Sequence, residues 1–310
     1  ILIDMVLHSR FDETEMGKEK LVILEEMKMS EDQPDELVHD MLSELIFRNT
    51  PLEKQIIGTR QSLCSIGRQD ILSYIGQEYV RDSIVVSIAG NFDEEEMYRY
   101  FEGRLSELAA GKETKAAAVC AYRPRYALKV KDVEQTHICM GLPGVSLKDD
   151  EMYYAMSLLN NVMGGTMSSR LFQNIREEKG LAYSVYSAAT SHTNAGAFYI
   201  YAGINSAKVE EAIEGIACEL RLLAEQGISE EELSVAKEQT KSSYIFGQES
   251  ANGRMFSNGK NTLLLNEVRP PQRVLRDIDA VTMETVARAA DKISDLSRYC
   301  VAVVSNRDWD

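Results

Sequence analysis

The sequence of 310 residues lacks the features that define several common protein classes. Its five cysteines are odd in number and widely spaced, and no two of them form a C-x-x-C pair. This pattern argues against a disulfide framework or a cysteine zinc site and favours a reducing compartment, so we expect a cytoplasmic protein. The longest apolar runs fall well short of the ~20 residues that a membrane-spanning helix needs. The apolar start also lacks the basic flank and cleavage site of a secretory signal.

Positive charge is scarce as well. Lys and Arg total 34 against 49 Asp and Glu, which gives a net charge of −15. Phosphate contacts require a basic face, so we expect no nucleic-acid partner, and the short apolar runs predict no membrane partner. With 44% hydrophobic and 27% charged residues the composition is that of a globular protein, and the length suggests about two domains.

Strand patterns and helix patterns come in runs rather than in βαβ alternation, which is typical of an α+β fold. In the first part, the sequence predicts helices over 13–29, from 34, 69–79 and 93–105, and a strand over 83–90. In the second part, it predicts strands over 126–130, 135–141, 182–191, 195–203 and 299–304, and helices over 150–163, 168–179, 207–225 and 230–246. Small and polar residues between the two parts indicate a linker. We therefore predict a first domain over 1–108, a linker over 109–120 and a second domain over 121–310.

A weak internal repeat indicates that the two parts are duplicated. Residues 12–16 resemble 229–233 at an offset of 217 residues, and residues 87–91 resemble 302–306 at an offset of 215. Two matches in the same order at nearly one offset favour a duplication. The first copy would then begin about 100 residues before Ile1, where the chain starts on an apolar helical pattern without a capping residue. We expect the first domain to be incomplete.

Two segments carry candidate chemistry, and the first is an acidic helix. Glu19 and Glu26 are seven residues apart, so they lie on one face of the predicted helix, two turns apart. Val22 and Ile23 share that face, which predicts that at least one carboxylate lies near apolar packing and needs a partner or a metal. A solvated acidic helix face is the alternative interpretation.

The second segment begins at the pair Gly164 and Gly165, whose turn leads into a capped helix, and Gly180 ends that helix before a strand. It does not match a phosphate-binding loop, because neither G-x-x-x-x-G-K nor G-x-G-x-x-G occurs in it. Taken alone, it is a helix between two turns.

Together these segments resemble the pitrilysin/insulinase superfamily of inverted-zinc metallopeptidases, and within it the processing-peptidase-like branch. Residues 168–187, SSRLFQNIREEKGLAYSVYS, resemble the signature of that family's second domain. Residues 10–40 resemble the stretch that follows its zinc motif. The resemblance extends over essentially the whole chain. It implies two duplicated domains, each a mostly antiparallel sheet covered by helices, which close around a substrate chamber.

The resemblance also implies an activity and roles for single residues. It predicts a zinc-dependent endopeptidase that cleaves peptides or unfolded protein segments and forms a homodimer. Glu26 matches the third protein ligand of the zinc ion, and Glu19 matches a supporting glutamate. Arg176 and Tyr183 match a pair with which the second domain binds the substrate and stabilises the reacting carbonyl.

The sequence departs from the family at its catalytic motif. In H-x-x-E-H, two histidines bind zinc and the glutamate acts as general base. None of the four histidines belongs to such a motif: His8, His39, His137 and His192. Catalytic zinc needs three protein ligands and an open water position, so Glu26 alone cannot hold it and this chain alone should be inactive. The repeat offset places the motif before Ile1.

A non-catalytic subunit of the same superfamily, either substrate-recognising or structural, is the alternative function. The retention of both Glu19 and Glu26 favours a peptidase, because a scaffold has no use for a metal ligand. The short turn at Gly164 also differs from the long glycine-rich loop of the eukaryotic recognition subunit.

Overall fold

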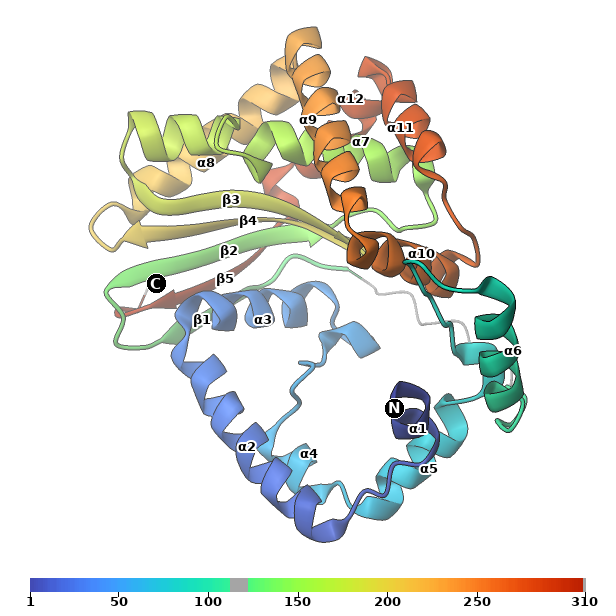
Figure 1. The fold of residues 1–310 in the computed structure, drawn as a ribbon. Helices are drawn as coiled ribbons and strands as arrows, with labels where there is room; N and C mark the ends of the chain where they lie inside the picture. The colour runs from blue at the N-terminus through green and yellow to red at the C-terminus, as the bar shows by residue number, and fades with distance from the viewer. Residues whose placement is uncertain (112–121, 309–310) are drawn as a thin grey trace. The chain divides into compact units, whose positions relative to one another are not determined.

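The computed structural model describes residues 1–111 and 122–308, which form two compact units (Figure 1). Unit 1 comprises residues 1–29, 56–116 and 247–269, and unit 2 comprises residues 30–55, 117–246 and 270–310. The contacts thus group two segments differently from the linear boundaries that the sequence predicts. Residues 30–55 belong with unit 2, and residues 247–269 belong with unit 1. Most of the predicted linker lies outside the described residues.

Helices make up most of unit 1 in the part of the chain that the structure describes. Its helices are α1 (Leu2–Leu7), the main part of α2 (Glu13–Asp32), α4 (Arg60–Ser65), α5 (Arg68–Glu78), α6 (Glu94–Leu105) and α10 (Ala251–Leu265). The predicted helices over 13–29, 69–79 and 93–105 are confirmed as α2, α5 and α6. Asp12 caps α2, because its carboxylate accepts hydrogen bonds from the backbone N–H groups of Thr14 and Glu15.

The predicted strand over 83–90 is wrong. A short 3₁₀ turn covers Arg81–Ser83, and the following residues are extended but pair with no strand within the described chain. The β-branched side chains of Val85, Val86 and Ile88 are 37–40% exposed. β-Branched residues favour extended backbone, but a strand also requires a neighbour to complete its hydrogen bonds.

Unit 2 is built around one five-stranded sheet with the order β1-β5-β2-β4-β3. The strands are β1 (Tyr126–Val130), β2 (Gln135–Pro143), β3 (Ala182–Ser191), β4 (Gly196–Asn205) and β5 (Cys300–Ser305). β1 and β5 are parallel, and the other three pairs are antiparallel. This confirms the α+β class, the mostly antiparallel sheet and all five strands predicted for the second part of the chain.

Helices cover both faces of this sheet (Figure 1). One face packs against α7 (Asp150–Asn160), α8 (Val209–Gln226) and α12 (Met283–Ile293), with α9 (Glu230–Glu249) and α11 (Pro271–Ala280) outside them. The opposite face packs against α3 (Pro34–Ile46). No helix within the described residues is long and apolar enough to span a membrane.

Helix α3 is placed by a short apolar stripe. Val38, Leu42 and Ile46 recur every four residues and are buried against β2, β4 and β5. A Cβ atom on Gly141 of β2 would lie 3.0 Å from Cδ2 of Leu42 and 2.8 Å from the carbonyl oxygen of Phe198. Glycine at this position therefore allows α3 to approach the sheet closely.

A second glycine fixes the turn that follows α7. A Cβ atom on Gly164 would lie 2.2 Å from the backbone nitrogen of Ser187 in β3, so only glycine fits without movement of the backbone.

We expect Gly164→Ala to lower the free energy of unfolding by about 1–3 kcal/mol, measured by urea denaturation. Gly247→Ala is the matched control, since no atom lies within 4 Å of its added Cβ on α9. An unchanged stability of Gly164→Ala would contradict this close approach.

Candidate functional site

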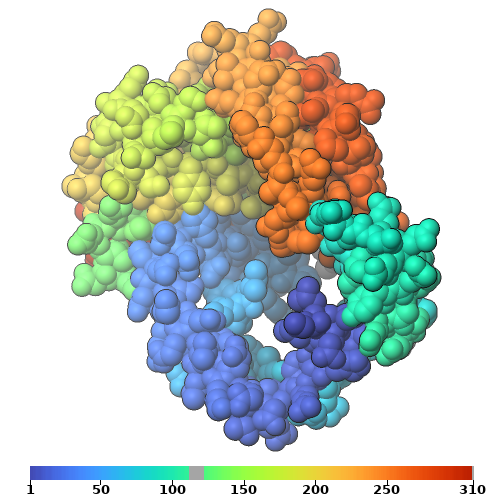
Figure 2. Space-filling model, viewed as in Figure 1, coloured from blue at the N-terminus to red at the C-terminus, as the bar shows by residue number. Residues whose placement is uncertain are grey.

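The segment between α7 and β3 forms two wide helical turns. Both η3 (Asn161–Gly165) and η4 (Phe172–Glu178) are π-helical, and Gly180 ends the second with a φ of +57°. The predicted helix over 168–179 is confirmed as a helix, although its turns are wider than those of the α-helix we expected. Residues 161–180 (yellow-green) form part of the surface of unit 2 in Figure 2. Such π-turns are often found at functional sites.

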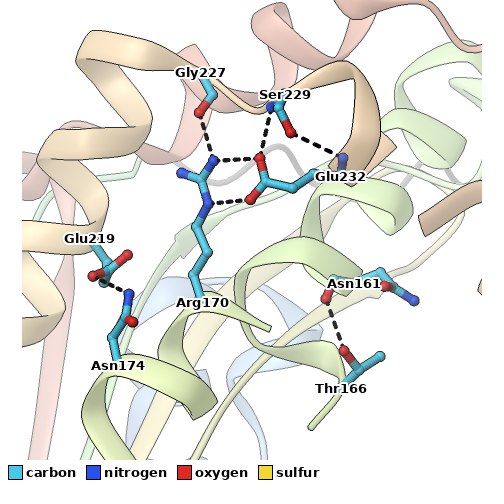
Figure 3. A network of polar contacts seen from close by, with 8 residues as sticks. All are labelled: Asn161, Thr166, Arg170, Asn174, Glu219, Gly227, Ser229 and Glu232. Atoms are coloured by element: carbon cyan, nitrogen blue, oxygen red, sulfur yellow. Dashed lines mark hydrogen bonds and ion pairs between the residues drawn. The ribbon is translucent and has the colours of Figure 1, made fainter. Parts of the chain in front are cut away.

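Arg170 fixes the start of this segment to the turn between α8 and α9 (Figure 3). Its Nε and Nη2 atoms donate to the two carboxylate oxygens of Glu232, both at 2.7 Å, and Nη2 also donates to the carbonyl of Gly227 at 3.0 Å. The same carboxylate accepts from the backbone N–H of Ser229 at 2.7 Å. Bidentate pairing of this kind fixes both partners in orientation.

Asn174 fixes the segment one turn later. Its Nδ2 atom donates to Oε1 of Glu219 at 2.7 Å, and Glu219 is only 5% exposed on α8. Buried carboxylates need hydrogen-bond partners, so this contact stabilises both side chains. Arg170 and Asn174 together hold the backbone of the segment against α8 and the start of α9.

Arg176 and Tyr183, which the family resemblance singles out, lie together. Cζ of Arg176 is 5.7 Å from the centre of the Tyr183 ring and 4.8 Å from the centre of the Phe172 ring. Tyr183 is 76% exposed at the start of β3. The Nε atom of Arg176 also forms an ion pair of 3.7 Å with Oε1 of Glu177. Neither the guanidinium nor the Tyr183 hydroxyl donates a hydrogen bond to another described residue.

Glu19 and Glu26 both lie on α2, as the seven-residue spacing predicts, and both are exposed. Neither carboxylate has an ion pair within the described residues, whereas the adjacent Glu25 pairs with Lys28 at 2.6 Å. Of the two apolar residues expected on this face, Val22 is 51% exposed and Ile23 is half-buried. In the described structure the alternative interpretation, a solvated acidic face, fits this helix.

These carboxylates do not make a zinc site by themselves. Within residues 1–111 and 122–308, no group of three or more His, Cys, Asp or Glu side chains is arranged to hold a metal ion. Zinc sites in proteins use three or four ligands. The described residues therefore do not fit a bound zinc ion without further ligands.

Two histidines have structural positions between α3 and the sheet. Nδ1 of His39 contacts the carbonyl of Asp35 at 2.6 Å, and the Tyr186 hydroxyl donates to its Nε2 at 3.1 Å. Nδ1 of His137 contacts the Tyr201 hydroxyl at 2.9 Å, and burial lowers the pKa of His137. Both side chains are thus satisfied by neighbours within unit 2.

The residues that hold the segment around Arg176 were not predicted from the sequence. The pair of Arg170 and Glu232 spans 62 residues, a separation at which no local pattern operates. Ser229 and Glu232 have the spacing of a capping box, which is a readable signal for the start of α9. Phe172 stands four residues before Arg176, a spacing that brings side chains together on a helix.

Comparison with known proteins identifies the family. Residues 65–240 match the peptidase M16 inactive domain, and residues 1–60 match the insulinase family, peptidase family M16. The chain is 38% identical over 309 residues to the uncharacterized zinc protease YmxG of Bacillus subtilis, covering 98% of this chain and 74% of that protein. The chain belongs to peptidase family M16. An uncharacterized zinc protease of Rickettsia bellii is 32% identical over 306 residues, and the match covers 99% of this chain and 74% of that protein.

Solved structures agree with this M16 assignment at the level of the fold. A protease from Helicobacter pylori has a TM-score of 0.84 at 18% identity and covers 96% of this chain and 73% of its own. A peptidase M16 inactive domain from Pseudomonas fluorescens has a TM-score of 0.85 at 19% identity and covers 99% and 73%. The M16 chain thus spans about three quarters of the length of these relatives.

The Arg170–Glu232 pair predicts that the stability of the chain depends on pH. Hydrogen bonds from Arg170 hold the pKa of Glu232 below its usual value of 4.5. A lowered folded-state pKa contributes stability above pH 4.5, and that contribution is lost as the pH falls from there through the lower folded-state pKa. We expect Glu232→Gln to reduce the slope of the unfolding free energy against pH over this range. The free energy is measured by urea denaturation from about pH 3 to 6. The exposed Glu231→Gln should retain the full slope, and equal slopes in both variants would disprove the coupling.

Proposed function

We propose that this chain forms the substrate-binding part of a zinc-dependent endopeptidase that cleaves peptides or unfolded protein segments. The observation that carries the proposal is the pairing of Arg176 with Tyr183 at the surface of unit 2, where neither side chain donates a hydrogen bond to another described residue. The zinc protease names of relatives at 38% and 32% identity support the class of reaction. A cytoplasmic location and a homodimer remain part of the proposal.

The chemistry of the pair suits a peptide carbonyl. A guanidinium offers five N–H donors in a fixed fork and stays charged at any physiological pH. When a carbonyl carbon is attacked, negative charge develops on its oxygen, and donors already in place stabilise that charge. We infer that Arg176 provides the charged donor and that the Tyr183 hydroxyl provides a second, neutral one.

The metal-binding part of the proposal concerns α2. We propose that Glu26 is one zinc ligand and that Glu19 supports it, with the remaining ligands supplied from outside the 310 residues. The free carboxylates of both residues on one helix face support this assignment. A carboxylate that binds a metal must not already be engaged in an ion pair. Glu25 is engaged in one with Lys28, so it is the less suitable ligand.

A non-catalytic subunit of the same family is the second candidate. The profile that matches residues 65–240 describes an inactive domain, which supports binding without cleavage in this part of the chain. In that function Arg176 and Tyr183 would bind a peptide segment, and the loss of Glu26 would have no consequence. The metal content of the complete gene product separates the two candidates.

The zinc assignment predicts different behaviour for two adjacent carboxylates. In the complete gene product, we expect Glu26→Gln to lower the affinity for zinc by at least about tenfold and therefore to lose its bound zinc. Glu25→Gln should retain its zinc. The metal content is measured by inductively coupled plasma mass spectrometry after dialysis, and circular dichroism checks the fold. Retention of zinc by Glu26→Gln, or absence of zinc from the unsubstituted protein, would argue for the non-catalytic subunit.

The binding assignment predicts a loss of activity without a loss of metal. We expect Arg176→Ala to lower kcat/KM for an internally quenched fluorescent peptide by about 100-fold, because a charged donor to the reacting oxygen is removed. Its zinc content should equal that of the unsubstituted enzyme. The control is Arg221→Ala, which removes an exposed arginine that pairs with Glu214 on α8. If Arg176→Ala loses zinc while cleavage persists, the assigned roles are wrong.

A further inference from the structure

Phe172 is the aromatic ring nearest to the Arg176 guanidinium. Cζ of Arg176 lies 4.8 Å from the centre of the Phe172 ring, closer than the 5.7 Å to the Tyr183 ring. Both distances are within the range of about 6 Å over which the face of a ring attracts a cation. Phe172 is half-buried, whereas Tyr183 is largely exposed, so Phe172 is the more constrained of the two rings.

The backbone beneath this pair is fixed on its other side. Arg170 is bound to Glu232, and Asn174 is bound to Glu219 (Figure 3). Phe172 and Arg176 are offset by two residues from these contacts and therefore lie on a different face of the helical segment. With the backbone held, the freedom that remains at Arg176 is in its long side chain, which has several rotatable bonds.

A ring restricts this freedom without using a hydrogen-bond donor. Cζ of Arg176 lies over the Phe172 ring, and a guanidinium that stacks on a ring face keeps the N–H groups at its edge available. Arg170 shows the contrasting arrangement, because its donors are engaged by Glu232 and Gly227. Glu177, the acidic neighbour of Arg176, is 3.7 Å from Nε, beyond hydrogen-bond distance.

We propose that Phe172 is a positioning residue, whose ring holds the Arg176 guanidinium so that its donors face an oxygen of a bound peptide. This inference rests on the proposed function of Arg176. The ring acts through the negative charge of its face, and it does not itself touch the reacting atoms. Phe172 thus sets how well Arg176 is oriented before the substrate arrives.

Fluorination of this one ring provides the test. In the complete zinc-loaded gene product, phenylalanine carrying one, two or three fluorine atoms is incorporated at position 172. Each fluorine weakens the attraction of the ring face for a cation and barely changes the size of the ring. We expect kcat/KM for an internally quenched fluorescent peptide to fall stepwise, by about tenfold at three fluorine atoms. The melting temperature and the zinc content should stay unchanged, and Phe172→Tyr should retain activity.

Two comparisons make the result specific. The same fluorine series in Arg176→Ala should be flat, because no guanidinium is left to position. The control is Tyr100→Leu, which removes an aromatic ring from another Arg four residues away on α6, where Cζ of Arg104 is 5.7 Å from the ring centre. It should leave kcat/KM unchanged.

The outcomes distinguish this inference from the proposed function. If Arg176→Ala is impaired and the fluorine series is flat, the positioning function of Phe172 is overturned and the function of Arg176 stands. If the series falls equally in the Arg176→Ala background, Phe172 acts by another route and the inference is likewise wrong. If Arg176→Ala cleaves at the unsubstituted rate, the proposed function fails, and the inference fails with it.

Discussion

The structure of unit 2 depends on the burial of its sheet on both faces. Along β2, Ile138, Met140 and Leu142 belong to the core under α7, α8 and α12, while Cys139 belongs to the core under α3. Side chains alternate between faces along a strand, so a sheet with apolar residues at successive positions needs a second covering layer. Helix α3 supplies that layer, although it ends at Ile46 and the first strand of the sheet begins only at Tyr126. The close approach at Gly141 shows how tightly the layer fits.

Burial from both sides gives the candidate site a rigid base. The segment of residues 161–180 contacts β3 through Gly164, and it contacts α8 and the start of α9 through Asn174 and Arg170. Tyr183 is the second residue of β3 and lies between Ala182 and Ser184, where the register of the β3–β4 pair shifts, as in a β-bulge. Sites built on helices and strands are more precise than sites on loops. Arg176 and Tyr183 therefore meet because two elements of one folded unit meet.

Local patterns in the sequence predicted the helices and strands of unit 2 but did not predict which of them pack against one another. The five strands follow from β-branched and alternating residues within each segment, but nothing local indicates that residues 34–46 cover the sheet from a distance. The same limit explains the wrong prediction of a strand over 83–90. A strand forms only when two segments pair, whereas the sequence pattern describes a single segment. At the site, Arg176 and Tyr183 were chosen by resemblance to a family. The contacts of Glu232 with Arg170 and of Glu219 with Asn174, which hold the segment that carries Arg176, form only in the folded chain.

The two arginines of the segment show why partners decide function. Arg170 and Arg176 stand six residues apart and carry the same guanidinium. Arg170 donates three hydrogen bonds, whereas Arg176 donates none to a described residue. A carboxylate partner consumes donors and neutralises charge, so an arginine held that way stabilises the fold. An aromatic partner leaves both the donors and the charge available, at the cost of a weaker hold. The proposed contact of Arg176 with a substrate oxygen requires the second arrangement, and Phe172 and Tyr183 are placed to provide it.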